Sequence, residues 1–378
     1  MSDAKGLQGV AVADTSLSRV SGDIGELIIR GYQIADLGAH VTYEEAVYLL
    51  WYDVLPTATQ LETFKATLAA TRVIPTELLD LLKQFPQTAH PMAVLRSAVS
   101  LLGLYDPQAD DIRLAGAREK ALRLVAQLPT MVAAWERIRQ GKEVVAPQAD
   151  LGHAANFLYM MNGAEPNQDA VKALDAYLVL LIDHDFNAST FSARVTTGTS
   201  ADMYSAITTA LGTLKGPAHG GANQKAMEQF LAAAATGDVA QWYNDFRDAG
   251  NRVMGIGHRE YKVEDPRARV LRPLAEKVAL TSGNGRWYDI ASQIEKLTRQ
   301  DDYFVSRNLY ANVDYYSAVV LYMLNIPVDQ FTCVFAISRV AGWTGHVLEQ
   351  LANNRLIRPQ ANYTGQTGRQ VVPLAERE

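Results

Sequence analysis

The stretch Gly216-Pro217-Ala218-His219-Gly220-Gly221-Ala222-Asn223 places a histidine between a proline and two glycines, directly before an expected helix. Glycine weakens regular structure and lets the backbone approach a ligand closely, so core packing explains this imidazole poorly. The alternative is a turn histidine at a helix start, with no ligand nearby. A neutral imidazole at a helix N-terminus has a lowered pKa and can donate a hydrogen bond to a developing enolate. The stretch therefore favours an enzyme that moves a proton off carbon.

Two further segments hold a titratable side chain on tight backbone. Met254-Gly255-Ile256-Gly257-His258-Arg259 is open enough for main chain to lie along a flat or phosphorylated ligand. Asn312-Val313-Asp314 begins an apolar helix expected from Val313 to Leu324. Asp314 has an alternative interpretation as the N-cap of that helix, since aspartate is among the best caps. Together with the two histidines, it is favoured as a general base.

Outside these segments, the hydrophobic periodicity is helical from about Thr42 onward. The spacing from Thr42 to Glu45 is that of a capping box. No βαβ alternation is present, which disfavours a parallel-sheet nucleotide fold. Two β-leaning stretches at 9–15 and 26–31 flank a turn at 21–23 and predict a short N-terminal hairpin. The predicted fold class is all-α. After the helix that begins at Thr42 and ends before Pro56, helices are expected at about 58–71, 75–84, 91–103, 110–127, 167–183, 191–212, 223–248, 266–281, 286–299, 313–325 and 328–353.

The chain has 378 residues and 41.5 kDa, enough for a large helical domain that carries a smaller one. The stretches near 216–222 and 325–328 are the expected joints between them. This predicts a large domain built from residues 1–218 and 328–378, with a small helical domain at 219–327 inserted in it.

The composition, with 48% hydrophobic and 20% charged residues, is that of an ordinary soluble globular protein. A net charge of −6 provides no basic field for nucleic acid. No apolar run approaches the ~18 residues of a membrane helix, and Met1 to Gly6 holds no apolar signal region, so a cytoplasmic protein is expected. The single cysteine, Cys333, lies in an apolar stretch typical of a buried inert thiol. No two of the seven histidines have helical ligand spacing, so we expect no metal site.

Three arginines are hard to explain by structure alone. Arg267 follows an aspartate and a proline at a helix start, Arg339 lies inside the most apolar helix, and Arg358 lies in the C-terminal tail. A stem that snorkels to the surface is the ordinary explanation for each, but together they can clamp a small dianion by paired N–H donors. His184 closes the apolar run at 178–182 and alone is typical of a core histidine.

At these residues the chain resembles citrate synthase of the short bacterial and archaeal type, from about Gly6 to Gly365. The resemblance is carried by the segments 30–32, 184–190, 216–223, 257–267 and 312–314. It implies an acyltransferase of the tricarboxylic acid cycle that condenses acetyl-CoA with oxaloacetate and water to citrate and CoA, through an enolate and citryl-CoA. It also implies no metal or redox cofactor, and an almost wholly helical homodimer whose two domains close on oxaloacetate.

The resemblance further implies a role for each site residue. Asp314 removes a methyl proton from acetyl-CoA, His219 hydrogen-bonds the enolate, and His258 polarises or protonates the ketone of oxaloacetate. The residues implied to hold oxaloacetate are His184, Arg267, Arg339 and, reaching in from the other subunit, Arg358. Those implied to line CoA are Gly255, Ile256, Gly257, Arg259, Lys262 and Arg307.

The chain departs from the family pattern at two places near the implied CoA site. Glu260 stands where the family usually has a small apolar residue, and Arg307 to Ala311 replaces a common lysine-containing version. The chain also lacks the N-terminal extension of the hexameric, NADH-inhibited type, which implies a dimer without that control.

Two alternatives remain at this stage. A 2-methylcitrate synthase shares every catalytic residue and takes propionyl-CoA, and one extra methylene in an apolar pocket changes selectivity by only ~10–200-fold. A non-catalytic helical protein that binds CoA or a dicarboxylate is the other. The trio His219, His258 and Asp314 argues against it, because a binding protein has no use for the carboxylate.

Overall fold

The computed structural model describes residues 5–7 and 9–377. Over these residues the chain forms seventeen α-helices and one small three-stranded sheet, which confirms the predicted all-α fold. Residues 1–4 and 378, the outermost residues of the predicted large domain, lie outside the described range. None of the described helices combines the length and the apolar character that a bilayer-spanning segment needs.

The N-terminal sheet is antiparallel, in the order β1 (Ser18–Ser21), β2 (Glu26–Ile29) and β3 (Tyr32–Gln33). Its first turn spans residues 22–25 and overlaps the predicted turn at 21–23, but the expected strand at 9–15 is wrong. That stretch has β-forming residues but pairs with no strand and is largely exposed. The chain becomes buried and paired only from Leu17, whose carbonyl accepts the backbone N–H of Arg30 at 2.9 Å.

The helices follow the sheet in chain order. They are α1 (Ile34–His40), α2 (Tyr43–Tyr52), α3 (Ala58–Thr71), α4 (Thr76–Leu82), α5 (Pro91–Leu104), α6 (Leu114–Arg139), α7 (His153–Asn162), α8 (Gln168–Leu180), α9 (Ala188–Gly198), α10 (Met203–Leu214), α11 (Ala222–Thr236), α12 (Val239–Asp248), α13 (Pro266–Thr281), α14 (Arg286–Thr298), α15 (Asp302–Val305), α16 (Val313–Met323) and α17 (Phe331–Ala352). The predicted capping box at the start of α2 is confirmed, because Thr42 and Glu45 each accept the other's backbone N–H.

Three helices, α1, α7 and α15, were not predicted, and two predicted helices are divided. The stretch 223–248 breaks at Gly237, whose φ of 75° ends α11 in the left-handed region, and Asp238 then caps α12. The stretch 191–212 breaks before Asp202, which caps α10. In contrast, α6 continues through Pro129 beyond the predicted end, since burial on both sides of the proline outweighs the lost hydrogen bond.

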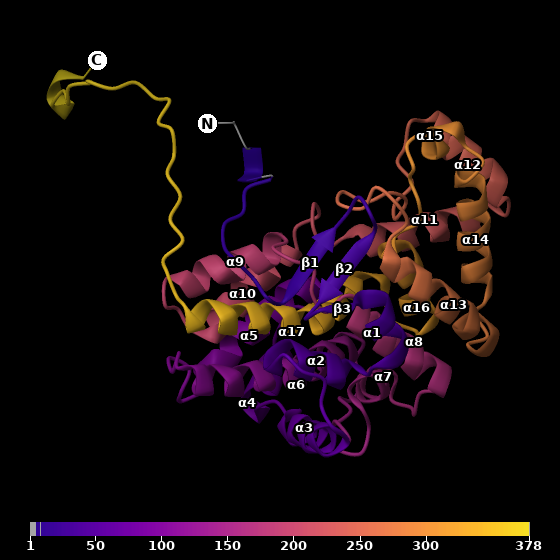
Figure 1. The fold of residues 1–378 in the computed structure, drawn as a ribbon, viewed down its shortest axis with the longest axis horizontal. Coiled ribbons are helices and arrows are strands. Elements are labelled where there is room, and N and C mark those ends of the chain that lie inside the picture. The colour runs from indigo at the N-terminus through magenta and orange to yellow at the C-terminus, as the bar shows by residue number, and fades with distance from the viewer. Residues whose placement is uncertain (1–4, 8, 378) are drawn as a thin grey trace.

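The buried helix α17 lies at the centre of the larger group of helices and packs against α2, α6, α8, α9 and α10 (Figure 1). Helices α11 to α16 gather on one side of that group (Figure 1). The division into a large domain and an inserted small one stays a prediction. Beyond α17 the chain is extended and exposed, and it runs away from the helices to its C-terminal end (Figure 1).

Candidate active site

A cavity of about 990 Å³ lies among the ends of α8, α9, α11, α13 and α16 and the side of α17. Most of the predicted site residues line it: His184, His219, His258, Arg259, Lys262, Arg267, Asp314 and Arg339. Sequence reasoning missed a second group, the N-terminal residues Leu7, Val10, Val12 and Asp23, which also line this cavity. No local pattern marks them, because they reach the cavity only through the fold.

The loop that carries His258 is tied to the loop before α16. Gly255 and Gly257 have φ values of 77° and 85°, in the left-handed region that favours glycine. The Gly257 N–H donates to the carbonyl of Tyr310 at 2.7 Å, and the Asn312 N–H donates to that of Gly255 at 2.8 Å. A Cβ on Gly255 would lie 2.9 Å from the Cα of Tyr315. The glycines therefore let two protein loops pack together, and residues 255–257 do not line the cavity in this chain.

Asn312, and not Asp314, caps α16. The Asn312 side-chain oxygen accepts the backbone N–H groups of Asp314 at 2.9 Å and Tyr315 at 3.3 Å. The alternative interpretation of Asp314 as an N-cap is therefore wrong. Within the described residues its carboxylate makes no hydrogen bond, and it faces the cavity. Burial raises the pKa of Asp314 to about 6, against the opposing effect of Arg267 and Arg339.

Asp265 connects Arg267 to the start of α16. Its two carboxylate oxygens accept from the Arg267 guanidinium at 3.0 and 2.9 Å, and one of them also caps α13 through the Arg267 N–H. The other accepts the backbone N–H of Val313 at 3.1 Å. Both side chains are buried, so this pair is a fixed part of the cavity wall. Arg267 is thereby held beside Asp314, the next residue after Val313.

His258 accepts hydrogen bonds at Nδ1 from the backbone N–H groups of Glu260, at 3.1 Å, and Tyr261, at 3.3 Å. A backbone N–H can only donate, so the neutral ring carries its proton on Nε2. Burial lowers the pKa of His258 to about 4, and Arg267 adds to this effect. The His184 ring lies 5.7 Å from the His258 ring, and its Nε2 is 3.1 Å from the Tyr261 hydroxyl.

His219 has the opposite tautomer. Its Nε2 accepts the backbone N–H of Ser189 at 3.3 Å and lies 2.8 Å from the Ser189 hydroxyl, so the neutral ring carries its proton on Nδ1. The indole N–H of Trp343 donates to the same hydroxyl at 3.1 Å. Burial lowers the pKa of His219 to about 4, with Arg339 adding to the effect. Sequence reasoning missed both Ser189 and the Trp343 that hydrogen-bonds to it, because they lie far from His219 in sequence.

Arg339 is almost fully buried in α17. Its Nε donates to the carbonyl of Leu181 at 2.8 Å, and its guanidinium lies 4.7 Å from the centre of the Phe335 ring. Burial lowers the pKa of Arg339 to about 10, which leaves it charged at neutral pH. Since Nη1 and Nη2 make no hydrogen bond within the described residues, they are available to an anion in the cavity.

Besides residues 255–257, two further predicted site residues lie outside the cavity. Arg358 is exposed in the tail beyond α17. Arg307 is exposed, lies 4.2 Å from the centre of the Tyr303 ring and donates to the Tyr303 carbonyl. In contrast, Arg259 and Lys262 line the cavity, and the backbone N–H of Lys262 donates to the carbonyl of Gly22 at 3.0 Å. That bond attaches the turn of the N-terminal hairpin to the loop after His258.

The chain is similar to known proteins over nearly its whole length. The family described as "Citrate synthase, C-terminal domain" matches residues 6–360. The citrate synthase of Haloferax volcanii is 44% identical, over 99% of this chain and 98% of its own length. The 2-methylcitrate synthase 1 of Corynebacterium glutamicum is 40% identical over 100% of both chains.

A solved structure is similar over nearly the whole chain. It is the citrate synthase of the thermophilic archaeon Thermoplasma acidophilum, in a ternary complex with carboxymethyl coenzyme A and oxaloacetate. It superposes with a TM-score of 0.90 at 33% identity and covers 99% of each chain.

Proposed function

This chain belongs to the citrate synthase family of acyltransferases, and from that premise we propose that it condenses acetyl-CoA with oxaloacetate and water to give citrate and CoA. The observation that carries the proposal is the protonation pattern of one cavity. A carboxylate with a raised pKa and two neutral histidines, each with one N–H left for a ligand, all line it. This is the set of groups that proton abstraction next to a thioester carbonyl requires.

In the first step Asp314 takes a proton from the methyl group of acetyl-CoA. The Nδ1–H of His219 donates to the thioester oxygen, on which the enolate charge develops. A pKa of about 6 keeps Asp314 ionised at neutral pH while making it a stronger base than an ordinary aspartate. The neutral state of His219 matters because the pKa of a neutral imidazole N–H is closer to the pKa of the enol than that of an imidazolium is.

In the second step the enolate carbon attacks the ketone carbon of oxaloacetate. The ketone oxygen takes its proton from Nε2 of His258, and the product is citryl-CoA. Water then cleaves the thioester to citrate and free CoA. We assign Arg267, Arg339 and His184 to the carboxylates and carbonyl of oxaloacetate, since two buried guanidiniums offer the paired donors that a dicarboxylate needs.

The residues predicted to bind CoA differ in their position relative to the cavity. Arg259 and Lys262 line the cavity and are suited to its phosphates, whereas Arg307 reaches CoA only if another conformation or a partner subunit brings it near. The Glu260 backbone N–H holds His258, which gives this position a role independent of its side chain. Residues 255–257 hydrogen-bond to Tyr310 and Asn312 and so hold the start of the 255–262 loop, which carries Arg259 and Lys262.

The proposed large and small domains meet at the cavity, which supports closure on oxaloacetate. His184 and Arg339 belong to the proposed large domain, and Arg267 and Asp314 to the small one. We therefore propose that oxaloacetate binds first and that closure completes the acetyl-CoA site. Small-angle scattering should detect compaction when oxaloacetate is added, and unchanged scattering would count against closure.

The alternative acyl donor is propionyl-CoA, favoured by the similarity to 2-methylcitrate synthases. The test is release of free CoA, followed with a thiol reagent, from acetyl-CoA and from propionyl-CoA, each with and without oxaloacetate. We expect release to require oxaloacetate and to be faster with acetyl-CoA. A higher kcat/KM for propionyl-CoA would assign the chain to 2-methylcitrate synthesis, and no release with either donor would leave only a binding role.

A further inference from the structure

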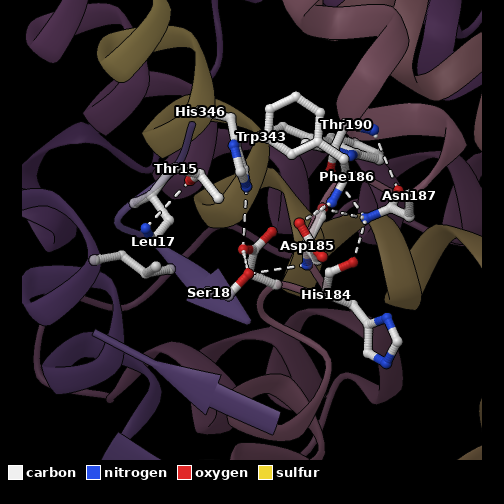
Figure 2. Close-up of polar contacts among 12 residues, drawn as sticks. Thr15, Leu17, Ser18, His184, Asp185, Phe186, Asn187, Thr190, Trp343 and His346 are labelled. Atoms are coloured by element: carbon white, nitrogen blue, oxygen red, sulfur yellow. Dashed lines mark hydrogen bonds and ion pairs between the residues drawn. The ribbon is translucent and has the colours of Figure 1, made fainter. Parts of the chain in front are cut away.

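A cluster of polar side chains, formed by Ser18, Asp183 and His346, lies beside the turn that carries His184. Asp183 and His346 have fully buried side chains, and Nε2 of His346 is 3.1 Å from Oδ2 of Asp183. The hydroxyl of Ser18, from β1, donates to the same oxygen at 2.5 Å. Figure 2 shows Ser18 and His346 beside this turn, with the His184 ring pointing away from them. The cluster joins α17 and the N-terminal sheet to one residue of the cavity.

The hydrogen-bond directions in the cluster can be assigned. Nη1 of Arg194, which can only donate, lies 3.2 Å from Nδ1 of His346. His346 therefore accepts at Nδ1, and its Nε2–H donates to Asp183. Arg194 is itself held by Glu349 at 2.6 Å and by Gln350 at 3.0 Å. A series of hydrogen bonds thus runs from the Arg194–Glu349 ion pair through His346 to the Asp183 carboxylate.

Ser18 also holds the residue on the other side of His184, Asp185. Its hydroxyl oxygen accepts the backbone N–H of Asp185 at 2.9 Å while its proton goes to Asp183. Asp185 has a φ of 51°, a left-handed conformation that a non-glycine residue keeps only when its surroundings hold it there. Asn187 adds bonds from its side-chain N–H to the carbonyls of His184 and Asp185, both at 3.3 Å. Both neighbours of His184 are therefore fixed by one serine.

Burying this polar cluster costs free energy, which is unexpected for a purely structural element. Within the described residues, Oδ1 of Asp183 has no hydrogen-bond partner although it is buried. A Cβ on Gly342 would lie 2.7 Å from that oxygen, so α17 is packed tightly against it. Replacing a buried ionic group by well-packed apolar residues is often neutral or stabilising, so stability alone does not explain this group.

We propose that His346 and Asp183 are positioning residues, which act through Ser18 and the 183–186 turn to aim the His184 ring at oxaloacetate. This rests on the proposed function, in which His184 binds that substrate. His346 does not itself line the cavity, although its ring packs edge-on against that of Phe186, which does. Its effect on the reaction is expected to appear in oxaloacetate binding and to pass through His184.

The test compares His346→Asn with His346→Gln in the full-length chain. Glutamine can place an amide N–H close to the position of Nε2, whereas asparagine is too short to reach Asp183. Oxaloacetate binding is measured by calorimetry without acyl-CoA. We expect His346→Asn to raise the dissociation constant by about tenfold or more, by analogy with the loss when a partner that orients a metal-ligating histidine is removed. His346→Gln should restore most of the affinity.

A double-mutant cycle separates positioning from stability. In a His184→Ala background, His346→Asn should cause no further loss of oxaloacetate affinity, since the residue through which it acts is gone. An equal loss in both backgrounds, or wild-type affinity in His346→Asn, would overturn the proposal. If His346→Asn does not fold, Ser18→Ala is measured in the same two backgrounds with the same expectation. A wild-type chain that does not bind oxaloacetate would overturn the proposed function, and this inference with it.

Discussion

The side-chain N–H of Asn312 donates to the backbone carbonyl of Gly257 at 2.8 Å. The same side chain caps α16 through its oxygen, so a single amide fixes the positions of His258 and Asp314 relative to each other. In the proposed reaction Asp314 takes a proton from the methyl carbon and His258 protonates the oxygen of the ketone carbon, and these two carbons form the new bond. Their separation is therefore set by the structure before substrate binds.

We predict that Asn312→Ser lowers turnover more than it lowers stability. Serine caps helices about as well as asparagine but cannot supply the N–H that reaches Gly257. Turnover should fall by about tenfold, whereas the melting temperature changes little, because a 1 Å displacement of a catalytic group can cost up to ~10²-fold. Steady-state kinetics and thermal unfolding of the same sample provide both quantities. Unchanged turnover would mean that this bond has no role in alignment.

Asp314→Asn should lower turnover and at the same time raise stability. Loss of the general base should cut turnover by roughly 10²–10⁴-fold, with oxaloacetate affinity nearly intact. Since burial raises the pKa of Asp314 to about 6, its charged form is disfavoured in the folded protein, and removing it should raise the melting temperature at neutral pH. Wild-type turnover in this variant would refute the assignment of the base.

The pH dependence follows from the same groups. Asp314 must be ionised to act, so kcat/KM for acetyl-CoA should fall as pH drops below about 6, tenfold for each pH unit. The pKa values of His219 and His258 are lowered to about 4, so both stay neutral across that range and steepen the fall only near pH 4. The profile is measured with a buffer series of constant ionic strength. An acidic limb that begins near the ordinary histidine pKa of about 6.5 and falls twice as steeply would contradict these assignments.

We also predict that Arg358 completes the site of a partner subunit. It is exposed and outside the cavity of its own chain, in an extended tail. Arg358→Ala and Asp314→Asn chains, each inactive alone, are mixed in equal amounts and allowed to exchange. About half of the dimers are then mixed, and each has one intact site, so about a quarter of wild-type activity should return. Proven exchange without recovery would place Arg358 outside the shared site.

The sequence predicted His219, His258 and Asp314 as site residues from their immediate neighbours, and all three line the cavity. Tight turns and helix starts are local, and a local pattern is what a sequence displays. The tautomer of His258 is also set locally, by Glu260 and Tyr261. Other contacts of the site are not local: Ser189 meets His219 across 30 positions, and Asp265 meets Val313 across 48. No spacing rule predicts such pairs.

The errors in the fold have the same origin. The stretch 9–15 has strand-forming residues, but a strand also needs a partner, and its neighbours in space were not known from the sequence. The glycines at 255 and 257 suggested a close approach to CoA. The structure shows their close approach to Tyr315 and Leu309, and the contact with CoA stays a prediction. In both places the sequence shows an unusual local pattern but not which residues lie beside it.

Product analysis tests the proposed reaction most directly. The full-length protein is incubated with oxaloacetate and with acetyl-CoA that carries carbon-13 in both acetyl carbons, and the products are identified by mass spectrometry. We expect citrate that retains both labelled carbons, formed in equal amount with free CoA, and no such product with Asp314→Asn. Free CoA accompanied by labelled acetate would indicate simple thioester hydrolysis. That result, or the absence of any labelled tricarboxylic acid, would contradict carbon–carbon bond formation at this site.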